Sequence, residues 1–523
     1  STHAVNASNF SDAAQSWANL AEAYATEAED IPVETGPNRF SALHWAAKAE
    51  AAAASASLTD DDVKREIDRK ILIESSRETI GDAPAPVAYL DCVTGIGLGD
   101  WAFSRASTKR FIDPFGEYAV AGVDQIALTH DEVTLEPRGA LLEGAGTNQL
   151  LHSEDFANAA WVKTAAATMS PIDRPDGAAK ATRLDNASAS VSQGVSQTFP
   201  MTGIEFTSRN AIVSAVVRAG TSSIVALRLT ATDSGDSDSK TGVGVFDLAN
   251  GTFVGDGVEP RLPWLRNIVA LPGGWWFIWA QLPSAPFVGL DSLQAEIIPA
   301  WNADGTATED MAATGSIDIW YAQAEAGVVP TSYIKTEAAS ATRAADVMYQ
   351  DLDRTQFRGR RFTIFAEFVC PVNNSGVFLL GDAAAGAASN AALQAGVGGT
   401  GAAVQTFIYQ SEAFETALNT GASFAYNATK MAIAAEPHDL EVWARTTTLE
   451  GVSTQSSDTD AGPDLAAFIA AADAETMRIA MGANRATQSM ASQTAAGATY
   501  LRRLFLYPAR LPTQNLKDLV GAT

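Results

Sequence analysis

From Val87 onward the sequence consists of short runs of alternating apolar and polar residues, broken repeatedly by Gly, Pro, Asn and Asp. Alternation with a period of two is typical of strands that bury one face, and the breakers supply the turns between them. The clearest runs cover residues 211–217, 224–230, 275–281, 316–322, 362–369, 377–380, 405–409, 440–444, 477–481 and 500–507. This pattern predicts a mainly β fold with two β-sandwiches.

The first part of the chain has a helical period instead. Phe10, Trp17 and Tyr24 are spaced a heptad apart, with Leu20 between them. Such an apolar seam predicts a helix that packs against partner helices, and Pro84 marks the end of the helical pattern because proline lacks an amide donor. We therefore expect an α-helical attachment and oligomerisation region whose interface contains Phe10, Trp17, Leu20 and Tyr24.

The chain has 523 residues, which at about 100 to 200 residues per domain predicts several domains. The changes of pattern give their expected bounds. These are a helical region at 1–83, a β-rich connector at 84–147, a first sandwich at 148–335, a linker at 336–346 and a second sandwich at 347–523.

Composition argues against several classes of protein. The formal net charge is -26, which repels a phosphate backbone, so we expect no nucleic-acid partner. Two cysteines, Cys92 and Cys370, are too few for a disulfide framework, and the five histidines form no HxH or HExxH pair. No apolar run is long enough to span a bilayer, and the N-terminus lacks the pattern of a secretory signal. We expect no membrane insertion, no metal site and no cofactor.

Several segments, spread over nearly the whole chain, resemble tail-fibre and spike proteins of tailed bacteriophages. The N-terminal one is Phe40–Ala46, which is similar to a fibre collar segment. The opening and closing segments of a carbohydrate-binding-type module are the most specific part of this resemblance. The segments are Phe103–Ser107, Gly139–Asn148, Ala322–Gly327, Pro330–Ile334 and Thr342–Asp346, with a lectin-like C-terminal run at Arg502–Tyr507.

This resemblance implies a carbohydrate-binding jelly roll at 148–335 and a concanavalin-like lectin sandwich at 347–523. It also implies a homotrimeric subunit on the particle surface, assembled in the host cytoplasm, that contacts other virion proteins through its N-terminal region and binds host surface polysaccharide. A tail fibre, a head spike and a fibre of a gene-transfer-agent-like particle all remain open at this point, as do a dimer in place of the trimer, a purely structural spike that recognises nothing, and the identity of the receptor.

Aromatic residues are the candidate ligand-binding groups, since flat rings stack on the apolar faces of sugars. Along 275–281 the aromatics fall on both faces of one predicted strand, so they fit either a sugar platform or a sandwich core, and the core is the commoner role. The candidates for ligand binding are Trp264, Trp276, Trp301 and Trp443.

Catalysis is less well supported by the sequence. Concanavalin-like glucanases carry Glu-x-Asp-x-x-Glu on one strand, and neither Asp318 with Glu325 nor the isolated Glu441 matches that spacing. The acidic loop at 233–238 has no EF-hand pattern, so a solvated turn is favoured over a calcium site. We expect no catalytic residues and no enzymatic activity, with a capsule-degrading depolymerase as the alternative.

Overall fold

In the computed structural model the chain forms two compact units, residues 1–83 and residues 84–523. The structure describes residues of the second unit, from Pro84 to Gly521. The predicted helical region, with Phe10, Trp17, Leu20 and Tyr24, lies outside the described residues. Within the second unit the gaps in the description are 165–166, 174–179, 201–209, 234–239, 255–264, 283–289, 302–312, 328–329, 353–356, 358–360, 371–374, 383–391, 399–402, 411–412, 420–427, 437–438, 447–449, 457–476 and 483–497.

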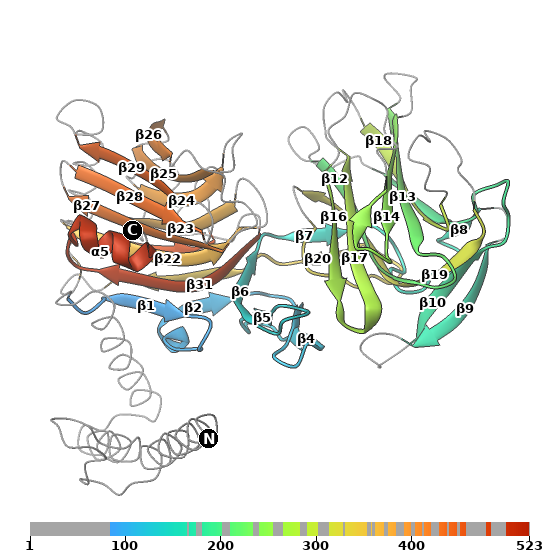
Figure 1. Cartoon of the computed structure of the whole chain (residues 1–523), viewed down its shortest axis with the longest axis horizontal. Coiled ribbons are helices and arrows are strands. Elements are labelled where there is room, and N and C mark those ends of the chain that lie inside the picture. The colour runs from blue at the N-terminus through green and yellow to red at the C-terminus, as the bar shows by residue number, and fades with distance from the viewer. Residues whose placement is uncertain are drawn as a thin grey trace, which may run out of the picture. The chain divides into compact units, whose positions relative to one another are not determined.

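The described part is mainly β, as the alternating pattern predicts, and all ten predicted runs lie in strands. Within it, no helix is long and apolar enough to cross a membrane. The strands form four large antiparallel sheets and two small ones (Figure 1).

The central sandwich consists of two six-stranded sheets, with strand orders β16-β17-β12-β19-β10-β9 and β15-β14-β13-β18-β11-β8. Its core contains apolar side chains from both sheets, such as Leu184, Val213, Leu227 and Ile297. The strands are β8 (Val162–Lys163), β9 (Thr168–Asp173), β10 (Lys180–Asn186), β11 (Val195–Pro200), β12 (Asn210–Ala219), β13 (Ile224–Asp233), β14 (Lys240–Asp247), β15 (Thr252–Phe253), β16 (Leu265–Leu271), β17 (Trp275–Leu282), β18 (Leu290–Pro299) and β19 (Gly315–Gly327).

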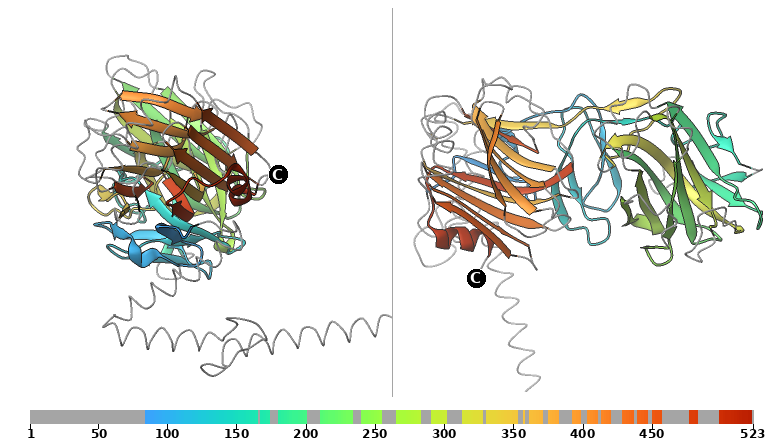
Figure 2. Two further views of the ribbon diagram at one scale, coloured as in Figure 1. Left: turned by 90° about the vertical axis from the view of Figure 1, so that its left-hand side faces the viewer. Right: turned by 90° about the horizontal axis from the view of Figure 1, so that it is seen from above.

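The C-terminal sandwich also has two sheets, and α5 (Thr513–Val520) contacts one of them at β27 and β28 (Figure 2). The sheet orders are β29-β28-β27-β22-β31-β6-β5, with β1 also on β31, and β2-β21-β30-β23-β24-β25-β26. Its C-terminal strands are β21 (Val347–Asp351), β22 (Phe362–Val369), β23 (Ser375–Asp382), β24 (Ala392–Gly398), β25 (Ala403–Gln410), β26 (Ala413–Asn419), β27 (Thr429–Glu436), β28 (Asp439–Arg445), β29 (Glu450–Ser456), β30 (Met477–Met481) and β31 (Ala498–Tyr507).

The connector supplies the remaining strands of both C-terminal sheets. Ala88 pairs with Leu506 and Leu142 with Thr499, so β31 lies beside both β1 and β6. Leu142 also belongs to the C-terminal core. The connector strands are β1 (Ala88–Asp91), β2 (Ala102–Ser104), β3 (Lys109–Ile112), β4 (Tyr118–Ala121), β5 (Leu128–His130), β6 (Pro137–Glu143) and β7 (Gly146–Asn148), and Leu98–Asp100 is a 3-10 turn.

The central sandwich is therefore inserted into the C-terminal one. The chain leaves through β7 and returns through β20 (Ala341–Arg343), and these strands pair with each other. The segment predicted as a linker thus contains a strand, and three of its polar residues, Thr336, Arg343 and Asp346, are buried. The sequence of this segment has no apolar period, because its buried side chains are polar and are held by hydrogen bonds.

Candidate functional site

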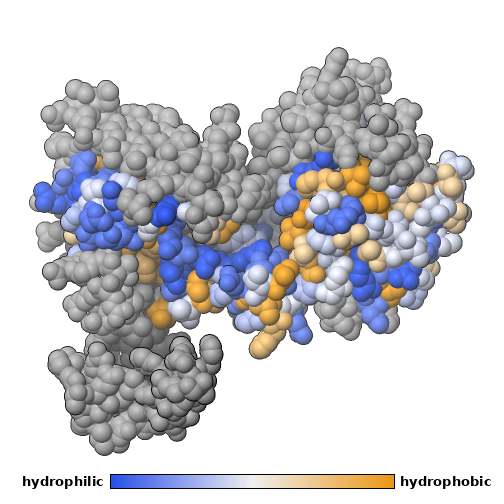
Figure 3. Space-filling model, in the orientation of Figure 1, coloured by the Kyte–Doolittle hydropathy of each residue, from blue (hydrophilic) through white to orange (hydrophobic). Residues whose placement is uncertain are grey.

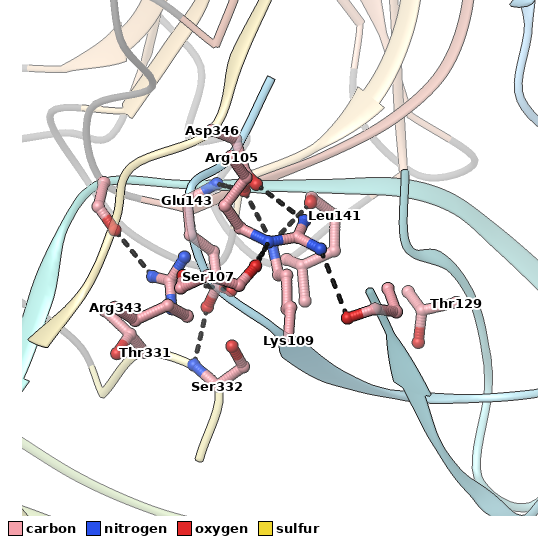
Figure 4. A network of polar contacts seen from close by, with 12 residues as sticks. Arg105, Ser107, Lys109, Thr129, Leu141, Glu143, Thr331, Ser332, Arg343 and Asp346 are labelled. Atoms are coloured by element: carbon pink, nitrogen blue, oxygen red, sulfur yellow. Dashed lines mark hydrogen bonds and ion pairs between the residues drawn. The ribbon is translucent and has the colours of Figure 1, made fainter. Parts of the chain in front are cut away.

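A buried network of charged side chains lies where the chain passes from the C-terminal sandwich into the inserted central sandwich and back (Figure 4). The Lys109 ammonium lies 2.7 Å from one Asp346 oxygen and 2.9 Å from Glu143, while Arg105 lies 3.0 Å from the other Asp346 oxygen. All four side chains are almost fully shielded from solvent. Since unpaired buried charges are costly, each of these groups fixes the position of its partners.

Glu143 links this network to the loop that follows β19. One of its oxygens accepts a hydrogen bond from the Ser332 amide at 2.8 Å, and the other faces Lys109 and Arg343. Burial alone would raise the pKa of Glu143, but the two cations lower it to about 2. The side chain is thus a carboxylate at neutral pH, and it ties the loop to β6.

Glu325 is a third buried carboxyl group in this region, after Asp346 and Glu143. It accepts hydrogen bonds from the Thr331 amide at 2.7 Å, the Thr331 hydroxyl at 2.9 Å and the Gln323 amide at 2.7 Å. Burial nevertheless raises its pKa to about 7. A side chain on Gly146 would lie 2.5 Å from the Thr331 hydroxyl and 2.8 Å from Glu325, so this close contact requires glycine.

A groove with a volume of about 440 Å³ lies beside this network. The connector turn at 131–138 and the start of β31, with Tyr500 and Arg502, form its walls, and β16 and β17 contribute further lining residues. A smaller cavity of about 160 Å³, also lined by Tyr500, Arg138 and Phe277, adjoins it. The larger volume is in the range of small-ligand sites.

Three carboxylates, Asp131, Glu132 and Glu136, and the guanidinium of Arg138 line the connector wall of the groove. An Arg138 nitrogen lies 2.7 Å from Asp131 and 2.8 Å from Glu132, and the guanidinium stands 5.8 Å from the centre of the Tyr500 ring. Burial raises the pKa of Glu132. Burial acts in the same direction on Asp131, but amide hydrogen bonds from Thr134 and Val133, together with Arg138, hold its pKa well below the usual range.

Strand β17 provides aromatic rings to the groove. Phe277 and Trp279 line it, together with Asn267 and Val269 of the neighbouring β16. Ile278 points the opposite way, into the core of the central sandwich. The alternation predicted from the sequence is therefore observed, and Figure 3 shows hydrophobic residues around β16 and β17 beside hydrophilic ones on the connector.

The three predicted ligand-binding tryptophans that the structure describes do not line this groove. Trp276 packs against the core on the other face of β17, and its ring lies close to Gly251. Trp301 is buried in a separate small cluster. Trp443 is buried, donates to Glu441 at 2.7 Å and has the Lys517 ammonium of α5 over its ring. Trp264 lies outside the described residues, and a ligand-binding role for all four stays a prediction.

Sequence reasoning did not single out the connector turn or Tyr500 as site residues. A signal was nevertheless present, because the segments that carry the phage-fibre resemblance come together at the insertion point. Arg105 and Glu143 come from the opening segments, and Ser332, Arg343 and Asp346 come from the closing ones. Among the described residues, no group of three or more His, Cys, Asp or Glu is arranged to hold a metal ion.

No protein-family model matches the chain, and no curated protein matches it either. Among solved structures, the CBM22-1-CBM22-2 tandem domain from Paenibacillus barcinonensis Xyn10C is similar at 10% identity, covering 70% of this chain and 98% of that one with a TM-score of 0.22. Bacteroides ovatus Xyloglucan PUL GH43B is similar at 12% identity, covering 77% and 86% with a TM-score of 0.19. Trypanosoma rangeli sialidase is similar at 10% identity, covering 68% and 62% with a TM-score of 0.20. Likenesses with TM-scores this low carry no argument about function.

Proposed function

We propose that this chain is a fibre or spike subunit of a tailed-bacteriophage-like particle and that it attaches the particle to a bacterial host by binding surface polysaccharide in the groove. The observation that carries the binding proposal is the groove itself, where aromatic rings and hydrogen-bonding side chains face one cavity. The half-buried Phe277 offers an apolar ring, the buried Trp279 lines the groove beside it, and Asn267, Glu132 and Arg138 offer donors and acceptors. A sugar ring presents the same combination, with apolar C–H faces and a rim of hydroxyls.

The particle role rests on the sequence resemblance and on the predicted helical region. In this proposal residues 1–83 join three copies and contact other virion structural proteins, and the jelly-roll and concanavalin-like sandwiches stand on the particle surface after assembly in the host cytoplasm. Each sugar contact is weak, because a hydrogen bond to a hydroxyl replaces one to water and contributes about 0.5 to 1.5 kcal/mol. Three copies acting together raise the avidity by about 10² to 10⁴ where their geometry allows it.

The test is a substitution in the groove with a matched control. Phe277→Ala removes a ring from the groove, and Phe115→Ala removes one that is 82% exposed and lines neither cavity. Purified full-length variants are compared for binding to polysaccharide extracted from host cells. Phe277→Ala should weaken binding about five- to tenfold, since an aromatic contact contributes on the order of 1 kcal/mol, and Phe115→Ala should bind like wild type. Equal binding by both variants would show that the polysaccharide does not bind in the groove.

Hydrolysis of the bound polysaccharide is the second candidate function. It is favoured by Asp131 and Glu132, whose pKa values are shifted in opposite directions on the groove wall, as in the acid and base pairs of glycosidases. Incubation of the polysaccharide with wild type and with Glu132→Gln distinguishes this function from binding alone. Chain shortening by wild type that is lost in the variant would establish a depolymerase, and an unchanged chain length would leave attachment as the function.

A further inference from the structure

The two guanidinium groups that line the larger cavity already have carboxylate partners. Arg138 contacts both Asp131 and Glu132. The Arg502 Nε lies 3.1 Å from a Glu367 oxygen. A ligand carboxylate or phosphate entering the groove would therefore have to compete with carboxylates that the protein holds in place.

The connector wall has more carboxylates than cations. Asp131, Glu132 and Glu136 line it together with the single guanidinium of Arg138. Glu136 is exposed and has no ion-pair partner among the described residues. Glu143 also borders the groove, but it is buried against Lys109, so its charge is balanced inside the protein. The wall that a ligand meets thus carries excess negative charge.

Among the described residues, Arg110 is the arginine that lines the smaller cavity without lining the larger one, and His130 lines the smaller cavity as well. Arg110 stands over the Trp320 ring at 5.5 Å and over the Tyr333 ring at 5.6 Å, so aromatic faces hold its guanidinium. Glu132 and Arg138 also line this smaller cavity, so the acidic wall borders both cavities, whereas Glu136 and Asp131 line the larger one alone.

Glu132 is the groove carboxylate that a ligand cation would affect most. Its side chain is only 10% exposed, and its Oε2 lies 2.8 Å from an Arg138 nitrogen that also contacts Asp131. Sharing one guanidinium between two carboxylates leaves their mutual repulsion partly uncompensated. A positive group placed beside Glu132 would relieve that repulsion in a partly desolvated site, where electrostatic interactions are stronger than in water.

We infer that the groove selects saccharides carrying a free amino group over matched uncharged and acidic saccharides. The ammonium group of such an amino sugar would lie against the wall formed by Glu132 and Glu136, while an apolar face of the sugar lies on Phe277. This inference rests on the proposed function, since it names the class of saccharide that the same groove takes.

The experiment measures the binding of three tetrasaccharides to the full chain by calorimetry at pH 6. They are a glucosamine oligomer with free amines, its fully N-acetylated form and an oligomer of galacturonic acid. The free-amine oligomer should bind about three- to tenfold more tightly than the N-acetylated one, and its binding should weaken as salt is raised from about 20 to about 200 mM. The acidic oligomer should bind most weakly.

Two groove variants and one control variant test whether the carboxylates of the connector wall cause the preference for the free-amine oligomer. Glu136→Gln alters an exposed residue and should keep the fold, while Glu132→Gln alters the more enclosed carboxylate. Both should reduce the preference for the free-amine oligomer, whereas Glu117→Gln, at an exposed position that lines neither cavity, should keep it.

The possible outcomes separate this inference from the proposed function. If the acidic or N-acetylated oligomer binds as tightly as the free amine, the charge selection is wrong while saccharide binding stands. The same conclusion follows if neither groove variant changes the preference. If none of the oligomers and no host polysaccharide binds, the proposed function fails, and this inference fails with it.

Discussion

The ammonium group of Lys109 and the carboxylate of Asp346, separated by 237 positions in the sequence, lie 2.7 Å apart with both side chains fully buried. Lys109 lies on β3 of the connector, and Asp346 directly precedes β21, where the chain re-enters the C-terminal sandwich. The pair therefore joins the connector, which precedes the inserted sandwich, to the chain segment that follows it.

Removing this ion pair should destabilise the protein strongly. Lys109→Met leaves Asp346 and Glu143 with fewer cations in a buried site, which we expect to cost about 3 to 5 kcal/mol in the free energy of unfolding. The measurement is the denaturant midpoint of the full chain. Lys335→Met, at a position that is 51% exposed, is the control and should change the free energy of unfolding much less. Equal midpoints for the two variants would show that the buried pair does not stabilise the junction.

Glu325 should make the stability depend on pH. Its pKa is raised by burial from 4.5 to about 7, so the folded protein retains a proton that the unfolded chain releases. The stabilising contribution is complete below pH 4.5 and is lost as the pH rises through about 7. Glu325→Gln cannot release this proton, so its stability relative to wild type should increase by on the order of 3 kcal/mol across that window.

The pH prediction is checked by chemical denaturation of both proteins at a series of pH values. The quantity to compare is the difference in the free energy of unfolding between the two proteins. Glu143 has a lowered pKa and makes both proteins less stable in acid, and this shared trend cancels in the difference. Glu117→Gln, at an exposed position, should follow the wild-type profile. A constant difference between wild type and Glu325→Gln from pH 4.5 to 8 would contradict the prediction.

The inserted sandwich should be removable without unfolding its host. Replacing residues 149–340 with Asn-Gly joins β7 to β20, which already pair from Asn148 with Ala341 to Gly146 with Arg343, through a two-residue hairpin turn. We expect a cooperatively unfolding β protein that has lost polysaccharide binding, since Phe277 and Trp279 are absent. Circular dichroism and thermal unfolding are the measurements.

A fragment of residues 148–523 is the informative contrast. It lacks β1, β2, β5 and β6, which pair in the two C-terminal sheets. Unpaired sheet edges favour aggregation, so this fragment should aggregate or unfold at a lower temperature than the full chain. A soluble fragment as stable as the full chain, or an unfolded 149–340 deletion, would show that the strand pairing does not define the folding unit.

The helical region should control oligomerisation. Trp17→Ala shortens the predicted seam of Phe10, Trp17 and Tyr24 and should weaken association by on the order of 3 kcal/mol if the ring is buried between chains. Sedimentation of the full chain over a concentration series measures this change. Gln15→Ala, off the seam, should associate like wild type. Trimers of undiminished stability in Trp17→Ala would place the interface elsewhere.

The strands themselves were predictable because their signal is local. In β17, Phe277 and Ile278 face opposite sides, as the alternation of neighbouring side chains requires. Which face of β17 lines the groove was not predictable, because both faces are rich in apolar residues. Trp276 was the sequence candidate, but Phe277 and Trp279 line the groove.

The sequence by itself determined the fold class and most strand positions, since turn residues and a period of two are readable within ten residues. Only the tertiary structure decided that β1 lies beside β31, that the central sandwich is an insertion, and that Glu132 and Tyr500 share one groove. Strand pairing joins residues as distant as Asp91 and Arg503, and buried polar groups such as Asp346 carry no apolar period. Their positions follow from long-range pairing and from the need to satisfy buried charges, and neither can be read from neighbouring residues.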